Sequence, residues 1–170
     1  MNNYQRSEIK GRKKLESWLT YYKFKNLSET KDAFDRVDFF ATSKRDRNYV
    51  FEIKDRNLIN KYTNKVYDSI LLETDKVNAV IQRKKDEKLD SAFYACFSNN
   101  ELYLFNLEKC PSWHHLALLP KTTAGESNEK VWKDATYFAI ENAWHFIKDE
   151  ANNWKLINKP LYYANHKKAN

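Results

Sequence analysis

The chain has 170 residues, 42% of them hydrophobic, and a net charge of +7 at neutral pH. This apolar content excludes a disordered chain, and the length suits one packed domain over residues 1–170 and is short for two. The basic excess favours an anionic partner such as nucleic acid, although a solvated, lysine-rich surface is an equally good explanation.

The first part of the chain has the pattern of a helix followed by a β-hairpin. Apolar residues at helical spacing predict a helix over about residues 7–25, with Ser7 as its cap. The stretches 36–42 and 49–54 have the pattern of strands, and the polar residues 43–48 between them are typical of a turn. We therefore expect an antiparallel hairpin in this region.

A second helix and a second hairpin follow. Apolar residues on one helical stripe predict a helix over about residues 64–85. The stripe consists of Val66, Ile70, Val77, Val80 and Ile81. Residues 90–97 and 101–107 flank a polar turn as a second hairpin, and a helix between two hairpins is the crossover of an α/β sheet. Within the extension 108–170, residues 130–146 fit either a helix or two short strands around an aromatic bend.

Cysteine and histidine give little indication of a metal site. Cys96 and Cys110 lack CxxC spacing, so buried thiols are expected rather than a disulfide or a zinc site. The adjacent His114 and His115 point apart on a strand or a helix. Apolar runs are too short for a membrane span, and residues 1–10 lack the apolar region of a signal peptide, so we expect a cytoplasmic protein.

Charged residues interrupt the strand predicted at residues 49–54. Side chains alternate along a strand, so Glu52 and Lys54 share one face while Ile53 and its apolar neighbours cover the other. On the preceding strand, Asp38 lies on one face and Val37, with Phe39 and Ala41, on the other. Antiparallel pairing brings Asp38 beside Glu52. Paired carboxylates favour a hard divalent cation such as Mg²⁺, and an ammonium can hold water or stabilise charge on a phosphate.

The arrangement of Asp38 with Glu52 and Lys54 resembles the PD-(D/E)XK nuclease superfamily, which includes restriction enzymes and Holliday junction resolvases, although Val37 replaces the motif proline. The resemblance implies an α/β fold with a restriction-endonuclease-like core over about residues 7–107. In that core a central mixed β-sheet is flanked by helices in the order α-β-β-α-β-β. It also implies a metal-dependent nuclease in which Mg²⁺ or Mn²⁺ is bound by Asp38, Glu52 and the Ile53 carbonyl, while Lys54 activates water.

Further site residues are implied by the same resemblance. Many members place a glutamate of the first helix at the metal, and Glu16 is the choice here with Glu8 as its rival. Glu73 or Lys76 of the next helix can also reach the site. Asp35 is an alternative to Asp38, which is preferred because it lies within the apolar strand.

DNA is favoured over RNA as the partner, and a homodimer is possible. Basic residues near the motif are candidates for phosphate contacts: Lys44, Arg45, Arg47, Arg56, Lys61, Lys65 and Lys76. The aromatic residues Tyr62, Tyr67 and Trp113 can stack on bases, but such residues more often belong to the core or its rim. A compact nuclease suits a phage, a mobile element or a restriction system. The alternatives are an inactive nucleic-acid-binding protein and a protein-interaction or inhibitor module.

Overall fold

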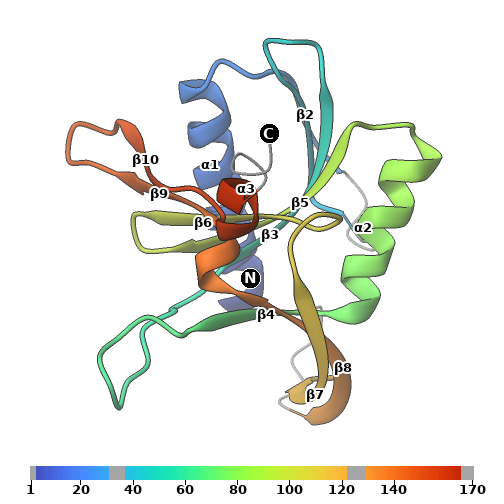
Figure 1. Ribbon diagram of the computed structural model, residues 1–170, viewed down its shortest axis with the longest axis vertical. Coiled ribbons are helices and arrows are strands. Elements are labelled where there is room, and N and C mark those ends of the chain that lie inside the picture. Colours follow the sequence, from blue (N-terminus) through green and yellow to red (C-terminus); the bar gives the residue numbers. More distant parts are fainter. Residues whose placement is uncertain (1–2, 31–36, 122–128, 166–170) are drawn as a thin grey trace.

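The structure, a computed structural model, describes residues 3–30, 37–121 and 129–165 (Figure 1). The described residues form the helices α1 (Asn3–Tyr21), α2 (Thr74–Asp86), η1 (Ile140–Asn142, a 3₁₀ helix) and α3 (Leu161–Asn165). They also form the strands β1 (Lys25–Glu29), β2 (Phe39–Thr42), β3 (Asn48–Asp55), β4 (Ser69–Glu73), β5 (Ser91–Ser98), β6 (Glu101–Asn106), β7 (Ser112–Pro120), β8 (Lys130–Ala139), β9 (Trp144–Lys148) and β10 (Trp154–Asn158).

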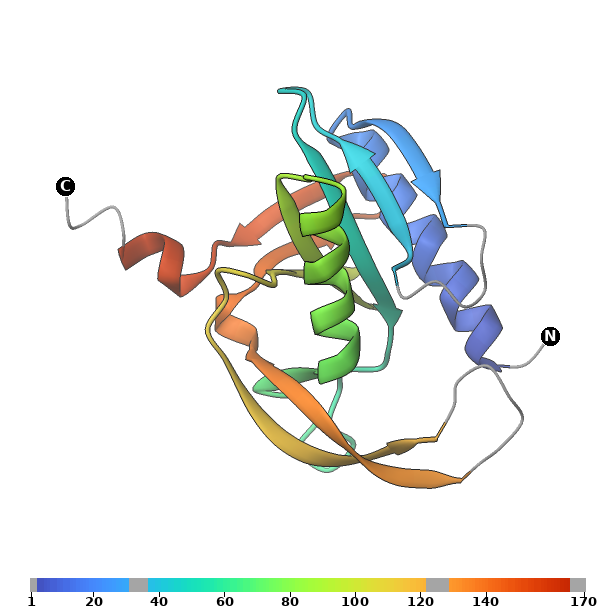
Figure 2. The same cartoon turned by 90° about the vertical axis from the view of Figure 1, so that its right-hand side faces the viewer.

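A seven-stranded mixed sheet forms the centre of the molecule, in the order β1-β2-β3-β5-β6-β9-β10. The β3–β5 pair is parallel, and the other neighbours in this sheet are antiparallel. α1 covers one face and α2 covers the other (Figures 1 and 2). This architecture confirms the predicted α/β fold, in which helices flank a central mixed sheet.

The two sheet faces carry separate hydrophobic cores. On one face, Trp18 and Leu19 of α1 pack with Phe51 of β3. On the other face, Val80 of α2 packs with Val50 of the same strand. Because side chains alternate along β3, one strand supplies apolar residues to both cores.

A smaller three-stranded sheet, in the order β4-β8-β7, lies beside α2. β4 pairs with residues 135–139 of β8, so the rest of β8 pairs with β7 alone. This part forms a ribbon that curves beneath the body of the molecule (Figure 2). Within the described residues, no helix is long and apolar enough to cross a membrane.

Both predicted hairpins are present, whereas the helix boundaries differ. α1 ends at Tyr21, and the following residues 25–29 form β1 instead of extending the helix towards Asn26. Lys23 lies between them with a φ of 59°, a left-handed conformation that does not continue a helix. The predicted second helix over 64–85 was wrong in its first part. Residues 69–73 form strand β4, in which the buried Ile70 and Leu72 alternate with less buried neighbours, and this strand pairs with β8.

Other predictions have mixed outcomes. Residues 130–146 form β8, η1 and β9, so the two-strand alternative is correct. Val37 packs in the core beside α2 and not with Phe39 and Ala41, because β2 begins after it. Cys96 and Cys110 are buried and free, as predicted, and burial raises the pKa of both thiols.

Candidate active site

The β2–β3 hairpin positions the first carboxylate. Phe39 pairs with Phe51 in an antiparallel register, which, continued by one residue, sets Asp38 opposite Glu52. The Asp38 amide donates to the Phe51 carbonyl at 3.0 Å, and Asp38 Oδ2 accepts a hydrogen bond from the Ile53 amide at 2.7 Å. Two hydrogen bonds therefore hold Asp38 against β3 at the start of β2.

Glu52 is the second carboxylate, and its side chain is 0% exposed. Its Oε1 lies 2.7 Å from Lys54 Nζ on the same strand and 2.9 Å from Lys76 Nζ in the first turn of α2. The two lysine side chains are 27% and 29% exposed, so each ammonium lies between the buried carboxylate and solvent. Among the described residues, the buried Oε2 of Glu52 has no hydrogen-bond partner.

The two carboxyl groups have opposite electrostatic environments. Burial and the nearby charge of Glu52 raise the pKa of Asp38 to about 6, although Lys54 and the Ile53 amide partly offset this. Burial acts in the same direction on Glu52, but the ammonium groups of Lys54 and Lys76 outweigh it and leave its pKa below the usual value. At neutral pH both groups are therefore ionised, with Asp38 the less stable anion.

The oxygen donors present here fit a hard divalent cation. The unpartnered Glu52 Oε2 is a buried acceptor, and a positive charge beside Asp38 relieves its repulsion from Glu52. Backbone carbonyls alternate in direction along a strand, so the Ile53 carbonyl lies on the same side of β3 as that of Phe51, which accepts from Asp38. Carboxylate and carbonyl oxygens are preferred ligands of Mg²⁺ and Mn²⁺. Within the described ranges, no group of three or more His, Cys, Asp and Glu side chains could hold a metal ion.

α1 brings a guanidinium to the site that the sequence analysis did not identify. Arg12 Nη2 lies 2.8 Å from Glu8 Oε1 and 3.5 Å from Asp38 Oδ1. The helix approaches β3 closely at Gly11, where a Cβ atom would lie 2.9 Å from Ile53 Cγ2. The only sequence signal for Arg12 was its spacing of four residues from Glu8, which is common on helix surfaces.

The structure does not bring Glu16, the predicted first-helix acid, into contact with the other candidate site residues. Glu16 is exposed, and within the described residues it forms no hydrogen bond or ion pair with Asp38, Glu52 or Lys54. It lies eight residues after Glu8, about 12 Å further along the helix axis. Glu8 is connected to Asp38 through Arg12, so the rival candidate is the better placed.

Among the helix candidates for the site, Lys76 reaches Glu52, whereas Glu73 pairs with Lys133 at 3.2 Å. Arg56, predicted to contact phosphate, donates from Nη1 to the Leu71 carbonyl at 2.9 Å. Its guanidinium links the end of β3 to β4 and faces the protein interior. The alternative Asp35 lies outside the described residues.

The other predicted phosphate contacts lie on exposed turns before and after β3. Lys44, Arg45 and Arg47 lie in the β2–β3 turn, at the other end of the hairpin. Arg47 is five residues from Glu52, which is about 16 Å along an extended strand. Lys61 is exposed after β3, with its Nζ 4.9 Å from the ring centroid of Tyr62.

The predicted stacking residues and histidines lie away from these carboxylates in the chain. Tyr62 is 85% exposed, and Tyr67 is also exposed. Trp113 stacks on Tyr137 across the β7–β8 ribbon. His114 Nδ1 lies 3.2 Å from Thr136 Oγ1, and both His114 and His115 are exposed on β7.

The chain matches no protein-family model and no curated protein. Among solved structures, it is similar to Hjc of Archaeoglobus fulgidus, a Holliday junction resolvase from an archaeal hyperthermophile. The similarity covers 76% of this chain and 84% of that chain, with a TM-score of 0.47 and 16% sequence identity. At this distance the similarity assigns neither a family nor residue roles.

Proposed function

We propose that the protein is a metal-dependent nuclease that hydrolyses phosphodiester bonds, with DNA as its substrate and Mg²⁺ or Mn²⁺ as its cofactor. The observation that carries this proposal is the state of Glu52. One oxygen of this buried carboxylate binds two lysine ammonium groups, and the other has no partner among the described residues although Asp38 lies alongside. The Glu52 side chain is thus poised for a cation.

A surface ion pair does not account for this arrangement. β3 lies between β2 and β5 in the central sheet, so it is not an edge strand. Glu52 is fully buried, and burying a carboxylate is costly unless it is paired and hydrogen-bonded. The structure tolerates that cost at a position where an apolar residue would pack without it, which favours a functional role.

Asp38, Glu52 and the Ile53 carbonyl would hold the ion. When bound, a divalent cation neutralises charge on the phosphate and lowers the pKa of water. Glu52 stays ionised because its pKa is low, and Asp38 becomes available as a ligand above its pKa of about 6. The site is therefore competent from neutral pH upwards.

The two lysines have separate roles in this proposal. Lys76 holds Glu52 Oε1 from α2, so the carboxylate keeps a cationic partner when Lys54 moves. Lys54 is then free to donate to the attacking water or to a phosphate oxygen on which negative charge builds. Hydrolysis adds the water oxygen to phosphorus and breaks one ester bond, and the departing oxygen takes up a proton.

The test is cleavage of labelled single-stranded, duplex and branched DNA, and of RNA, with Mg²⁺, Mn²⁺ or EDTA. We expect Glu52→Gln and Lys54→Ala to reduce metal-dependent cleavage at least about 100-fold, which is the scale of losing one electrostatic stabiliser. The matched control is Glu73→Gln, which changes a carboxylate that is paired with Lys133 and not with the lysines at Glu52. We expect this variant to retain cleavage. Cleavage by Glu52→Gln at the parent rate contradicts the proposal. Salt-sensitive binding without cleavage identifies an inactive binding protein instead.

A further inference from the structure

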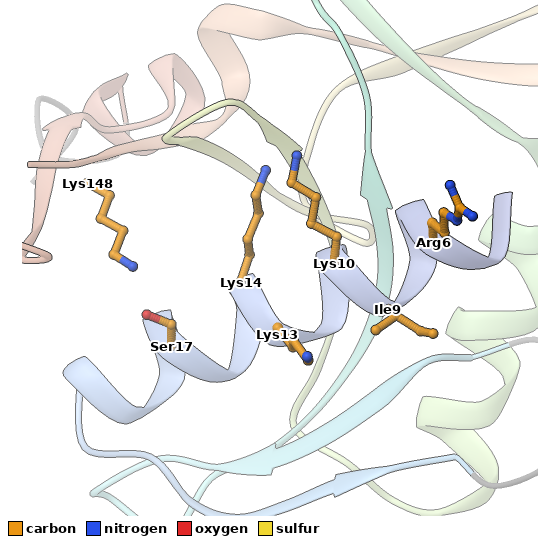
Figure 3. A pocket seen from close by; sticks show the side chains of 7 residues that line it. All are labelled: Arg6, Ile9, Lys10, Lys13, Lys14, Ser17 and Lys148. Atoms are coloured by element: carbon orange, nitrogen blue, oxygen red, sulfur yellow. The ribbon is translucent and has the colours of Figure 1, made fainter. Parts of the chain in front are cut away.

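The side of α1 that faces away from its buried stripe carries a concentrated positive charge. An open groove of about 490 Å³ runs along this side of the helix, and Lys148 of β9 lies near its Ser17 end (Figure 3). Its lining consists of Arg6, Ile9, Lys10, Lys13, Lys14, Ser17 and Lys148. We call this surface the α1 basic groove.

The spacing of these residues explains why they share one surface. Arg6, Lys10, Lys13 and Ser17 follow each other at steps of three or four residues, so they lie on one helical face. At about 100° per residue, this face is nearly opposite the flank that carries Glu8 and Arg12. The groove and the candidate active site are therefore on opposite flanks of the same helix.

Negative charge compensates the groove only in part. Asp55 lies 2.7 Å from Lys14 and 3.6 Å from Lys10. Within the described ranges, Arg6 and Lys13 form no ion pair. The lining contains no acidic residue, and the exposed Glu16, three residues from Lys13, borders it on the same helix. Uncompensated like charges repel one another, and a polyanion relieves that repulsion.

We infer that the α1 basic groove binds the backbone phosphates of a nucleic acid. Arg6 and Ser17 are eleven residues apart, which is about 16 Å along the helix. One strand of a duplex presents a phosphate about every 3.4 Å along its axis, so the groove spans roughly five phosphates. Ammonium and guanidinium groups aimed at phosphates carry affinity and no base sequence information.

This inference rests on the proposed function for its occupant, which is another segment of the nucleic acid cut near Asp38 and Glu52. A substrate that engages both surfaces holds α1 from its two flanks. The β2–β3 turn, with its exposed Lys44 and Arg45, is not required for this contact. The groove contributes to binding and leaves the chemical step unchanged.

The experiment is DNA binding in EDTA, which separates affinity from cleavage. The double variant Arg6→Gln with Lys13→Gln is compared with Lys85→Gln with Lys88→Gln, which removes the same charge from exposed positions at the end of α2. Fluorescence anisotropy of a labelled duplex is measured between 50 and 200 mM salt. Each lost phosphate contact lowers the salt slope by about 0.9, so the parent should lose about tenfold more affinity over this range than the groove variant. The α2 control should follow the parent.

Three results overturn or separate the claims. Equal salt slopes for the parent and the groove variant overturn the inference. Retention on a polyglutamate column is measured for comparison. If the parent binds no DNA but is retained on polyglutamate, and the groove variant loses that retention, the inference is overturned and the groove's partner is an acidic protein. A groove-dependent salt slope in a parent that cuts nothing supports the groove and refutes the proposed nuclease activity. Thermal unfolding of each variant verifies that the exposed substitutions leave the fold intact.

Discussion

Asp38→Asn tests the electrostatics of the site directly. The pKa of Asp38 rises from 3.8 to about 6 on folding, so its contribution to stability is fully present below pH 3.8 and is lost as pH rises through about 6. This rise in the pKa of Asp38, from 3.8 to about 6, corresponds to about 3 kcal/mol of stability, at about 1.36 kcal/mol for each unit of pKa. Asparagine cannot ionise, and its side-chain oxygen can still accept from the Ile53 amide. We therefore expect the variant to be more stable than the parent at pH 7.5.

Urea unfolding in EDTA at several pH values between 4 and 8 measures this effect. The free energy of unfolding of Asp38→Asn should exceed that of the parent by up to about 3 kcal/mol at pH 7.5, and the excess should disappear towards pH 4. The control Asp68→Asn changes an exposed aspartate and should show no such trend. A variant that is less stable than the parent at pH 7.5, or a difference independent of pH, refutes the assigned electrostatics of Asp38 and Glu52.

Three other predictions concern the metal ion, the packing of α1 and the role of Arg56. Mg²⁺ should raise the melting temperature of the parent more at pH 8 than at pH 5, because protonated Asp38 is a poor ligand. The Asp38→Asn variant should show little rise at either pH. Equal rises at both pH values in the parent contradict this prediction. Gly11→Val places a Cβ atom 2.9 Å from Ile53 Cγ2 and should lower the free energy of unfolding in urea by about 1–3 kcal/mol. Lys13→Val is the control at an exposed position of the same helix. Unchanged stability of Gly11→Val would show that α1 can shift to accommodate the side chain. Arg56→Gln should cost about 1–3 kcal/mol by removing the charged hydrogen bond to the Leu71 carbonyl, which keeps only the bond from Tyr94 Oη at 3.3 Å. Weaker DNA binding at unchanged stability would instead support the predicted phosphate contact.

Local patterns in the sequence predicted the elements that depend on neighbouring residues. Both hairpins follow from alternation and polar turns, and the second has Asn99 in the left-handed conformation that asparagine tolerates. The same alternation predicted that Glu52 and Lys54 share a face. The approach of Asp38 to Glu52 also followed, because a short hairpin determines its own register once the turn is located.

Longer-range contacts decided the rest. Ile70 fits a helical stripe as well as a strand, and only pairing with Phe138, far along the chain, makes it part of β4. Arg56 is a residue type that commonly contacts phosphate, but the direction of its guanidinium group depends on the Leu71 carbonyl of another strand. The sequence by itself determined which charged residues enter the hairpin, because that information is local. Only the tertiary structure decided that Lys76 and Arg12 join them and that Glu16 does not, because the packing of two helices on opposite sheet faces sets those contacts.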